Sequence, residues 1–468
     1  MNYRLRIASE AELDQLHAAS LKILAETGIK FMHEDALKVF RDNGFKVEDD
    51  IVYITEEQVN AALATCRQSF DFEALDPARK VVVGEDFVHA QPNAGAPNVH
   101  DSVGGHRSAT LEDYTNMVKI CQKLDPIGFN GSLPVDPSDV SHKHKHMYMV
   151  REALKYTDKP VLGLAMDGKG ANQQIDLVNI AIGEERSVED GHWIGVVVNP
   201  HSPLAWEPEG LETIMAFVQR NQPVFLAPAI MAGIAGPIDL AGTSVVQNTE
   251  ILSGIVFTQL IRPGAAVVYS TASTVVDMRR ASFCAGSSET MLINMPCLQL
   301  ARDRYKLPAR TMCGLTESSE IDAQAGFESM MSMMFGFMSG ANILVQILGT
   351  LDALMSTSYE KVIIDAENFS RMQRYQQGPD FTAVDSSVEL IRKVGHKADY
   401  LTQPDTFAKF RSMWAPMVSV WGKNGDDDTV VKRAREKYLQ ILADFTEPLL
   451  DSNTVAMLDA YIEKAISE

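Results

Sequence analysis

The sequence has 468 residues, of which 46% are apolar and 22% are charged, a composition typical of a folded globular protein larger than one average domain. Its formal net charge of −20 argues against nucleic acid or an anionic membrane as the partner, and suits either a cationic substrate or high solubility. The five cysteines are widely spaced, with no C-x-x-C pair, and the N-terminal segment lacks the apolar core of a signal peptide. We therefore expect reduced thiols in a cytoplasmic protein.

Residues 1–120 are expected to form an extension of helices and hairpins. Apolar residues recur at helical spacing in segments 10–27, 33–42 and 56–66, and a short strand is expected at 51–54. Residues 80–107 are rich in Gly, Pro and Asn between β-branched runs, which predicts hairpins and tight turns. Thr110 and Asp113 then match a capping box that begins a helix ending near residue 124.

Between residues 121 and 375, apolar runs of strand length alternate with helical patterns. Strands are expected at residues 128–133, 161–165, 193–198, 224–227, 266–269, 310–314, 343–348 and 361–365. Eight strands with intervening helices predict an α/β fold, a (β/α)8 TIM barrel, although the gap at 351–360 is short for a crossover helix. A doubly wound open sheet is the alternative, which is less favoured because no glycine-rich phosphate loop follows a strand.

Residues 376–468 become charged and helical. Helices are expected at 386–394, 404–411, 428–443 and 452–467. The predicted organisation is therefore an N-terminal extension (1–120) packed on a barrel (121–375), followed by a C-terminal helical segment (376–468).

Several common catalytic motifs are missing. His142 and His146 lie at i,i+4 spacing, but no acidic residue or cysteine lies nearby, so we expect a solvated helix start and no metal site. There is no G-x-S-x-G, no Walker sequence and no G-x-G-x-x-G after a strand. The sequence thus predicts neither a nucleotide cofactor nor an acyl-enzyme intermediate.

Polar and aromatic residues gather where the predicted strands end. They are Asn199, His201 and Trp206, then Tyr269 and Phe283, and finally Gln346, Asp365 and Phe369. Each of them alone is better explained by packing or helix capping. Together they combine aromatic rings, amides and few basic residues, which suits an uncharged or cationic ligand better than a phosphorylated one. Glu250, on an otherwise apolar helix, is either paired at the helix surface or turned toward the site.

Four motifs resemble the trimethylamine methyltransferase superfamily. They are the segments MAGIAGPIDLAG at 231–242, DAQAGFE at 322–328, SGANIL at 339–344 and SYEKVIID at 358–365. The resemblance spans nearly the whole chain. It implies a (β/α)8 barrel with added terminal helices that moves a methyl group from an amine to the cobalt(I) centre of a separate corrinoid protein.

One departure from the archaeal trimethylamine enzymes indicates the subgroup. Those enzymes carry pyrrolysine in the barrel, whereas residues 315–321 are all standard here. The chain therefore resembles the bacterial branch without pyrrolysine, which implies a quaternary amine substrate such as glycine betaine, proline betaine or carnitine. A quaternary ammonium already has a neutral amine as its leaving group, so catalysis requires orientation and water exclusion and no general acid.

The resemblance also implies roles for the candidate residues. Trp206, Tyr269, Phe283 and Phe369 would bind the ammonium, and Asn199, His201 and Gln346 would make polar contacts. Glu250 and Asp365, with Gln346, would tune charge or order water in catalysis. The corrinoid would belong to a partner protein with no cofactor bound tightly by this chain, which we expect to be a homo-oligomer. Two alternatives stay open: a barrel that binds or senses betaines without catalysis, and a metal-dependent hydrolase.

Overall fold

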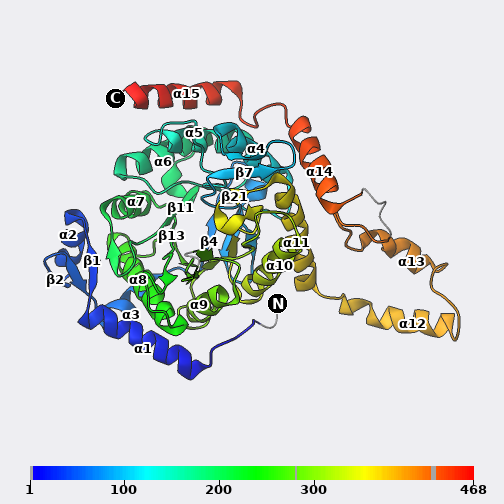
Figure 1. Ribbon diagram of the computed structural model, residues 1–468, viewed down its shortest axis with the longest axis horizontal. Helices are drawn as coiled ribbons and strands as arrows, with labels where there is room; N and C mark the ends of the chain where they lie inside the picture. Colours follow the sequence, from blue (N-terminus) through cyan, green and yellow to red (C-terminus); the bar gives the residue numbers. More distant parts are fainter. Residues whose placement is uncertain (1–3, 280–281, 423–427, 468) are drawn as a thin grey trace.

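Eight short parallel strands form the centre of the molecule and are surrounded by helices (Figure 1). The computed structural model describes residues 4–279, 282–422 and 428–467. In chain order the strands are β6 (His89–Ala90), β9 (Asn130–Gly131), β10 (Val161–Leu162), β11 (Ile194–Val198), β13 (Val224–Leu226), β15 (Val267–Thr271), β18 (Ala309–Met312) and β19 (Ile343–Val345). From β9 to β19 each strand pairs in parallel with the next, and β19 pairs in parallel with β6. The amides of Gly128 and Phe129 donate to the Ala90 carbonyl, which joins β6 to the β9 segment and closes the barrel.

One helix follows each strand, which completes the (β/α)8 pattern and confirms the predicted fold. The helices are α4 (Leu111–Lys123), α5 (Lys145–Tyr156), α6 (Gly168–Ile182), α7 (Pro208–Gln219), α8 (Leu240–Ile261), α9 (Ser288–Gln299), α10 (Ala323–Met338) and α11 (Tyr359–Gln377). The predicted capping box is present at the start of α4, where Thr110 and Asp113 bond each other's backbone amides.

The predicted eighth strand, at residues 361–365, is wrong. These residues lie in α11, whose N-cap Ser358 accepts a hydrogen bond from the Lys361 amide. The missing strand is β6, which comes first in the chain, inside the region expected to form turns. Strand β6, which precedes residue 121, and helix α4, which begins before it, thus belong to the barrel, and the three-part division of the chain stays a proposal.

Small sheets cover both ends of the barrel. A hairpin of β4 (Ser69–Phe72) and β5 (Val81–Gly84) closes the amino end, where Phe72 packs edge-on against Phe129 at 5.3 Å between ring centroids. At the carboxyl end lies a sheet of β7 (Asn98–Asp101), β8 (Gly105–Ser108), β20 (Thr350–Leu351) and β21 (Ser356–Thr357). Two hairpin strands, β16 (Thr274–Asp277) and β17 (Ser282–Cys284), join β14 (Met231–Ala232) beside it.

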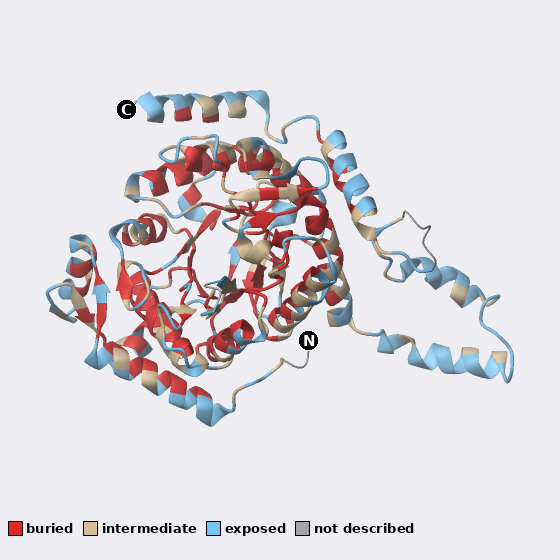
Figure 2. Ribbon diagram, in the orientation of Figure 1, coloured by how far each residue is buried: buried red, intermediate tan, exposed pale blue. Residues whose placement is uncertain are grey.

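The two ends of the chain add helices around the barrel. The N-terminal helices are α1 (Glu10–Glu26), α2 (Glu34–Asp42) and α3 (Glu56–Thr65), and the strands between them are β1 (Ile29–Phe31), β2 (Lys46–Glu48) and β3 (Ile51–Tyr53). β1 pairs with β12 (Ala205–Trp206) of the barrel, which attaches this unit. The C-terminal helices are α12 (Val384–Val394), α13 (Pro404–Lys409), α14 (Val430–Asp444) and α15 (Ser452–Ser467). Buried residues concentrate in the barrel and its helices, whereas α12 and α13 are exposed (Figure 2). In the described part of the chain, no helix has the length and apolarity to cross a membrane.

Candidate active site

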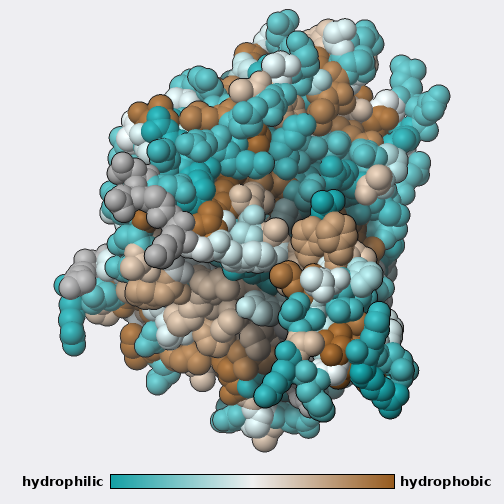
Figure 3. All heavy atoms as spheres, turned by 90° about the vertical axis from the view of Figure 1, so that its right-hand side faces the viewer, coloured by the Kyte–Doolittle hydropathy of each residue, from teal (hydrophilic) through white to brown (hydrophobic). Residues whose placement is uncertain are grey.

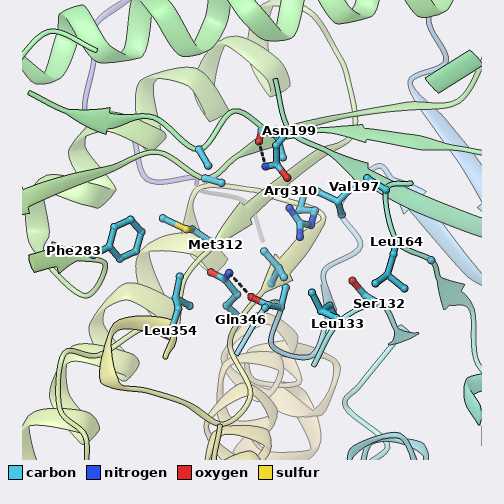
Figure 4. A pocket seen from close by; sticks show the side chains of 18 residues that line it. Ser132, Leu133, Leu164, Val197, Asn199, Phe283, Arg310, Met312, Gln346 and Leu354 are labelled. Atoms are coloured by element: carbon cyan, nitrogen blue, oxygen red, sulfur yellow. Dashed lines mark hydrogen bonds between the residues drawn. The ribbon is translucent and has the colours of Figure 1, made fainter. Parts of the chain in front are cut away.

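A cavity of about 370 Å³ lies at the carboxyl ends of the barrel strands (Figure 4). Residues at or just after the ends of all eight strands line it, which is the usual place for a barrel active site. Small residues that follow three of the strands, β10, β13 and β15, leave the space open: Gly163, Ala165, Ala227, Ala229 and Ala272. Its size suits a small organic molecule.

The cavity contains one buried cation, Arg310 of β18. The residue is 3% exposed, and its Nε donates to the Gln91 Oε1 at 3.0 Å. Among the described residues, no carboxylate forms an ion pair with this guanidinium, and no acidic residue lines the cavity. Burial lowers the pKa of Arg310 to about 9, which leaves the side chain charged at neutral pH. A buried cation without a counter-ion is costly, so the site favours a ligand that carries an anionic group.

An aromatic ring lies on another side of the same cavity. Figure 4 shows Phe283 well separated from Arg310, with Met312 between them. Phe283 comes from β17, the hairpin strand that borders the mouth of the barrel. A ring face of this kind attracts a cation, especially one removed from water. The cavity therefore offers an anion site and a cation site to one ligand.

Two amides add hydrogen-bonding groups. Asn199, after β11, donates through its Nδ2 to the Ala227 carbonyl. Gln346, after β19, has a φ of 65° and donates through its Nε2 to the Ala94 carbonyl at 3.4 Å. Within the described residues, the buried Oε1 of Gln346 has no hydrogen-bond partner. An unsatisfied acceptor in a cavity is available to a ligand.

Of the residues singled out in the sequence, Asn199, Phe283 and Gln346 line the cavity. Three aromatic residues pack elsewhere: Trp206 donates to Ser253 Oγ at 3.0 Å, Tyr269 donates to Asn248 Oδ1 at 2.8 Å, and Phe369 packs against Phe337. All three are fully buried in the layer between strands and helices. His201 is exposed beside Glu207, with its Nδ1 2.9 Å from Oε1.

The two singled-out carboxylates support loops near the cavity and do not line it. Glu250 of α8 accepts hydrogen bonds from Ser202 Oγ and from the Leu204 amide, both at 2.7 Å. Asp365 of α11 accepts from the Gly349 amide at 2.9 Å and pairs with Lys361 at 2.7 Å. Each one fixes a chain segment that follows a barrel strand.

The structural role of Glu250 can be tested by measuring how the stability of the protein depends on pH. Burial raises its pKa to about 7, above the ordinary value of 4.5, so the folded state holds a proton that the unfolded state has lost between these values. Glu250 therefore contributes a loss of stability to the wild-type protein as pH rises from about 4.5 to about 7, by at most about 1.4 kcal/mol per pH unit. In Glu250→Gln this loss is absent, so we expect the variant to gain stability relative to wild type across this window. Urea unfolding at several pH values measures the difference, and parallel curves for the two proteins contradict it.

Sequence reasoning missed Arg310. The sequence pattern places it in an apolar strand and predicts no role for it, because the candidate residues are those that follow the strand ends. The signal was present, since a charged residue inside a fully buried strand requires a partner or a ligand.

Comparisons with known proteins extend this picture. The family model described as "Trimethylamine methyltransferase (MTTB)" matches residues 2–468. The chain is 34% identical to a glycine betaine methyltransferase of Desulfitobacterium hafniense, over 98% of this chain and 97% of that protein. It is 31% identical to a proline betaine:corrinoid methyltransferase of Eubacterium limosum, over 85% and 83%. The crystal structure of the monomethylamine methyltransferase of Methanosarcina barkeri has a similar fold, with a TM-score of 0.56 and 12% identity over 97% of this chain and 89% of that one.

Proposed function

Because the chain belongs to the trimethylamine methyltransferase family, we propose that it demethylates a quaternary amine that carries a carboxylate. The methyl acceptor is the cobalt(I) centre of a corrinoid held by a separate protein. The N–CH3 bond breaks, its electron pair stays on nitrogen, and the product is a neutral tertiary amine. Cobalt(I) supplies the electron pair of the new bond and becomes methylcobalt(III), so charge and electrons balance.

The observation that carries this proposal is that one cavity contains both a buried cation, Arg310, and, well separated from it, an aromatic ring, Phe283. The guanidinium binds the carboxylate of a betaine through charge-assisted hydrogen bonds. The ring of Phe283 faces the ammonium. A simple cation such as trimethylammonium lacks the group that neutralises Arg310, so the site favours zwitterions.

The chain contributes binding, orientation and exclusion of water. The ammonium needs no general acid, which agrees with a described cavity lining that has no acidic residue. The unpartnered Gln346 Oε1 accepts weak C–H hydrogen bonds from the polarised N-methyl groups. Arg310 fixes the carboxylate end, so the ammonium end is held in one direction relative to the incoming acceptor.

The acceptor approaches from outside. A cavity of about 370 Å³ has room for a betaine and not for a corrin macrocycle beside it, so the corrinoid belongs to the partner protein. The partner works in a reducing compartment, which suits a cytoplasmic chain whose five cysteines are free thiols.

A cobalt assay tests the function directly. The purified chain is mixed with a reduced corrinoid protein and one of glycine betaine, proline betaine, carnitine, choline or trimethylamine, and methylcobalt is followed by absorbance. We expect methylation with at least one carboxylated betaine and little with choline or trimethylamine. Binding of a betaine without methyl transfer to any corrinoid protein supports the rival, a betaine-binding barrel without catalysis.

The variant Phe283→Leu tests the ammonium site. Loss of the ring is expected to lower kcat/KM for the betaine about 2- to 30-fold, which corresponds to about 0.5–2 kcal/mol of cation–π attraction. Its matched probe is 3,3-dimethylbutyrate, which has the shape and carboxylate of glycine betaine with a neutral carbon in place of nitrogen. The wild type binds the betaine more tightly than this analogue, and the variant reduces the preference. An equal loss of affinity for both ligands contradicts the cation site.

A further inference from the structure

Residues 378–413 form an arm that leaves the barrel after α11 and returns before α14 (Figure 1). The arm contains α12 and α13, and none of its residues is buried. The chain rejoins the barrel where Trp414 Nε1 donates to Ser370 Oγ of α11 at 2.9 Å.

The segment that follows the arm is held against α11 by a buried carboxylate. Glu367 of α11 accepts hydrogen bonds from the amides of Val418 and Ser419, at 2.6 and 3.0 Å, and pairs with Arg371 at 2.6 Å. Burial opposes its ionisation, but these bonds outweigh it and lower the pKa of Glu367 to about 2. The arm is therefore fixed to the barrel at its C-terminal end by these contacts, and at its N-terminal end it continues directly from α11.

Helix α12 carries an apolar seam that nothing covers within the described residues. Val384, Val388 and Ile391 of α12, with Phe381 in the turn just before it, follow the alternating three- and four-residue spacing of a coiled-coil seam. In chain order from Phe381 they are 77%, 49%, 39% and 56% exposed. A helix of 11 residues is marginal in water without a packing partner. Further apolar side chains lie exposed along the arm: Leu401, Phe407, Phe410 and Met413. Figure 3 shows the face from which the arm projects, with apolar residues gathered over part of it.

The charges of α12 indicate which partner fits. Asp385 and Glu389 lie in its first half, and Arg392 and Lys393 in its last turn. Two such helices in antiparallel contact bring the acidic half of each beside the basic half of the other, while the two seams meet. This self-complementarity is what a twofold interface requires. The arm as a whole has five acidic and five basic residues, so it is neutral in a chain of net charge −20 and avoids repulsion between two copies.

We propose that α12 pairs with α12 of a second copy of this chain, antiparallel and about a twofold axis. A corrinoid protein is the less suitable occupant, because a partner that binds and leaves at each turnover exposes the seam between encounters. The seam needs permanent cover, and a second copy provides it. The pairing is independent of the methyl transfer proposed above.

Light scattering after size exclusion tests the pairing on the full-length protein. We expect a dimer or higher even oligomer of the 51.6-kDa chain, and expect Val388→Asp/Ile391→Asp to shift it to a smaller species. That species loses at most the small share of helical circular dichroism that α12, 11 of 468 residues, contributes. The control is Met457→Asp on α15, which places one aspartate on a residue of similar exposure, 44%, and leaves the oligomeric mass unchanged. A monomeric wild type, or an arm variant that retains the wild-type mass, overturns the proposal.

Charge reversal tests the antiparallel direction. Two double variants reverse the charges of one half of α12: Asp385→Lys/Glu389→Lys and Arg392→Glu/Lys393→Glu. In a homodimer each of them places like charges opposite each other, so each variant alone is expected to dissociate at a higher protein concentration than the wild type. Mixed in equal amounts, they place a wholly basic α12 against a wholly acidic one, and the hetero-oligomer is restored. Failure of the mixture to associate more tightly than either variant alone contradicts the antiparallel arrangement.

Discussion

Replacing Arg310 with methionine is expected to raise KM for a carboxylated betaine by about 30-fold to several thousand-fold, and to stabilise the substrate-free protein. The first effect follows because truncating one partner of a buried charge pair costs about 2–5 kcal/mol. The second follows because Arg310 is buried without a counter-ion when the cavity is empty, so the substitution removes an uncompensated charge. Initial-rate kinetics and urea unfolding measure the two effects. A residue that only supports the fold lowers stability when it is removed, so the opposite signs identify a ligand-binding cation.

Arg302 supplies the matched control. Its guanidinium is also largely buried, but it donates to the carbonyls of Leu307 and Glu85 at the amino end of the barrel, away from the cavity. Arg302→Met leaves the Leu307 carbonyl without this donor and the Glu85 carbonyl with the donor from Asn342, so we expect reduced stability and an unchanged KM. If Arg310→Met instead behaves like this control, Arg310 is structural and the carboxylate binds elsewhere.

The barrel was predictable because seven of its strands are apolar runs separated by helical patterns. The eighth strand was not predictable, and there are two physical reasons: one explains why β6 was missed, and the other explains why residues 361–365 were predicted to be a strand. β6 is two residues long and lies among Gly, Pro and Asn, so its local sequence indicates turns, and only pairing with β19 makes it a strand. Residues 361–365 are an apolar run bounded by polar residues, a pattern common to a buried strand and the buried face of a helix.

The site was partly predictable because barrel chemistry gathers after strand ends. Asn199 and Gln346 were found by that rule, and Phe283 by its place in a loop beyond one. Tyr269 was also placed at a strand end, but successive side chains of a strand point to opposite sides. Tyr269 points away from the barrel interior, toward Asn248 of α8, and a single sequence does not reveal which phase faces inward. Arg310 reaches the cavity from within a strand by the length of its side chain.

Substitution of Asp365 also distinguishes a structural role from a catalytic one, because stability and activity can be measured separately. Its carboxylate pairs with Lys361 at 2.7 Å, with side chains 2% and 3% exposed, and Lys361 also donates to Ser329 Oγ. Asp365→Ala leaves the lysine charge buried and unpaired, so we expect a loss of about 3–5 kcal/mol in the free energy of unfolding, measured in urea. Activity per folded molecule is expected to change little, because the carboxylate holds the Gly349 amide and does not line the cavity.

Two further variants make this prediction specific. Replacing both partners, Lys361→Met/Asp365→Leu, removes the uncompensated charge and is expected to recover most of the lost stability. Asp405→Ala removes a carboxylate from an exposed pair of the same i,i+4 spacing, Lys409–Asp405 at 2.8 Å, and is expected to cost at most about 1 kcal/mol. The buried pair therefore differs from the exposed one through burial and not through spacing. If Asp365→Ala folds stably and yet loses methyl transfer, Asp365 acts in catalysis and its contact with Lys361 serves the reaction.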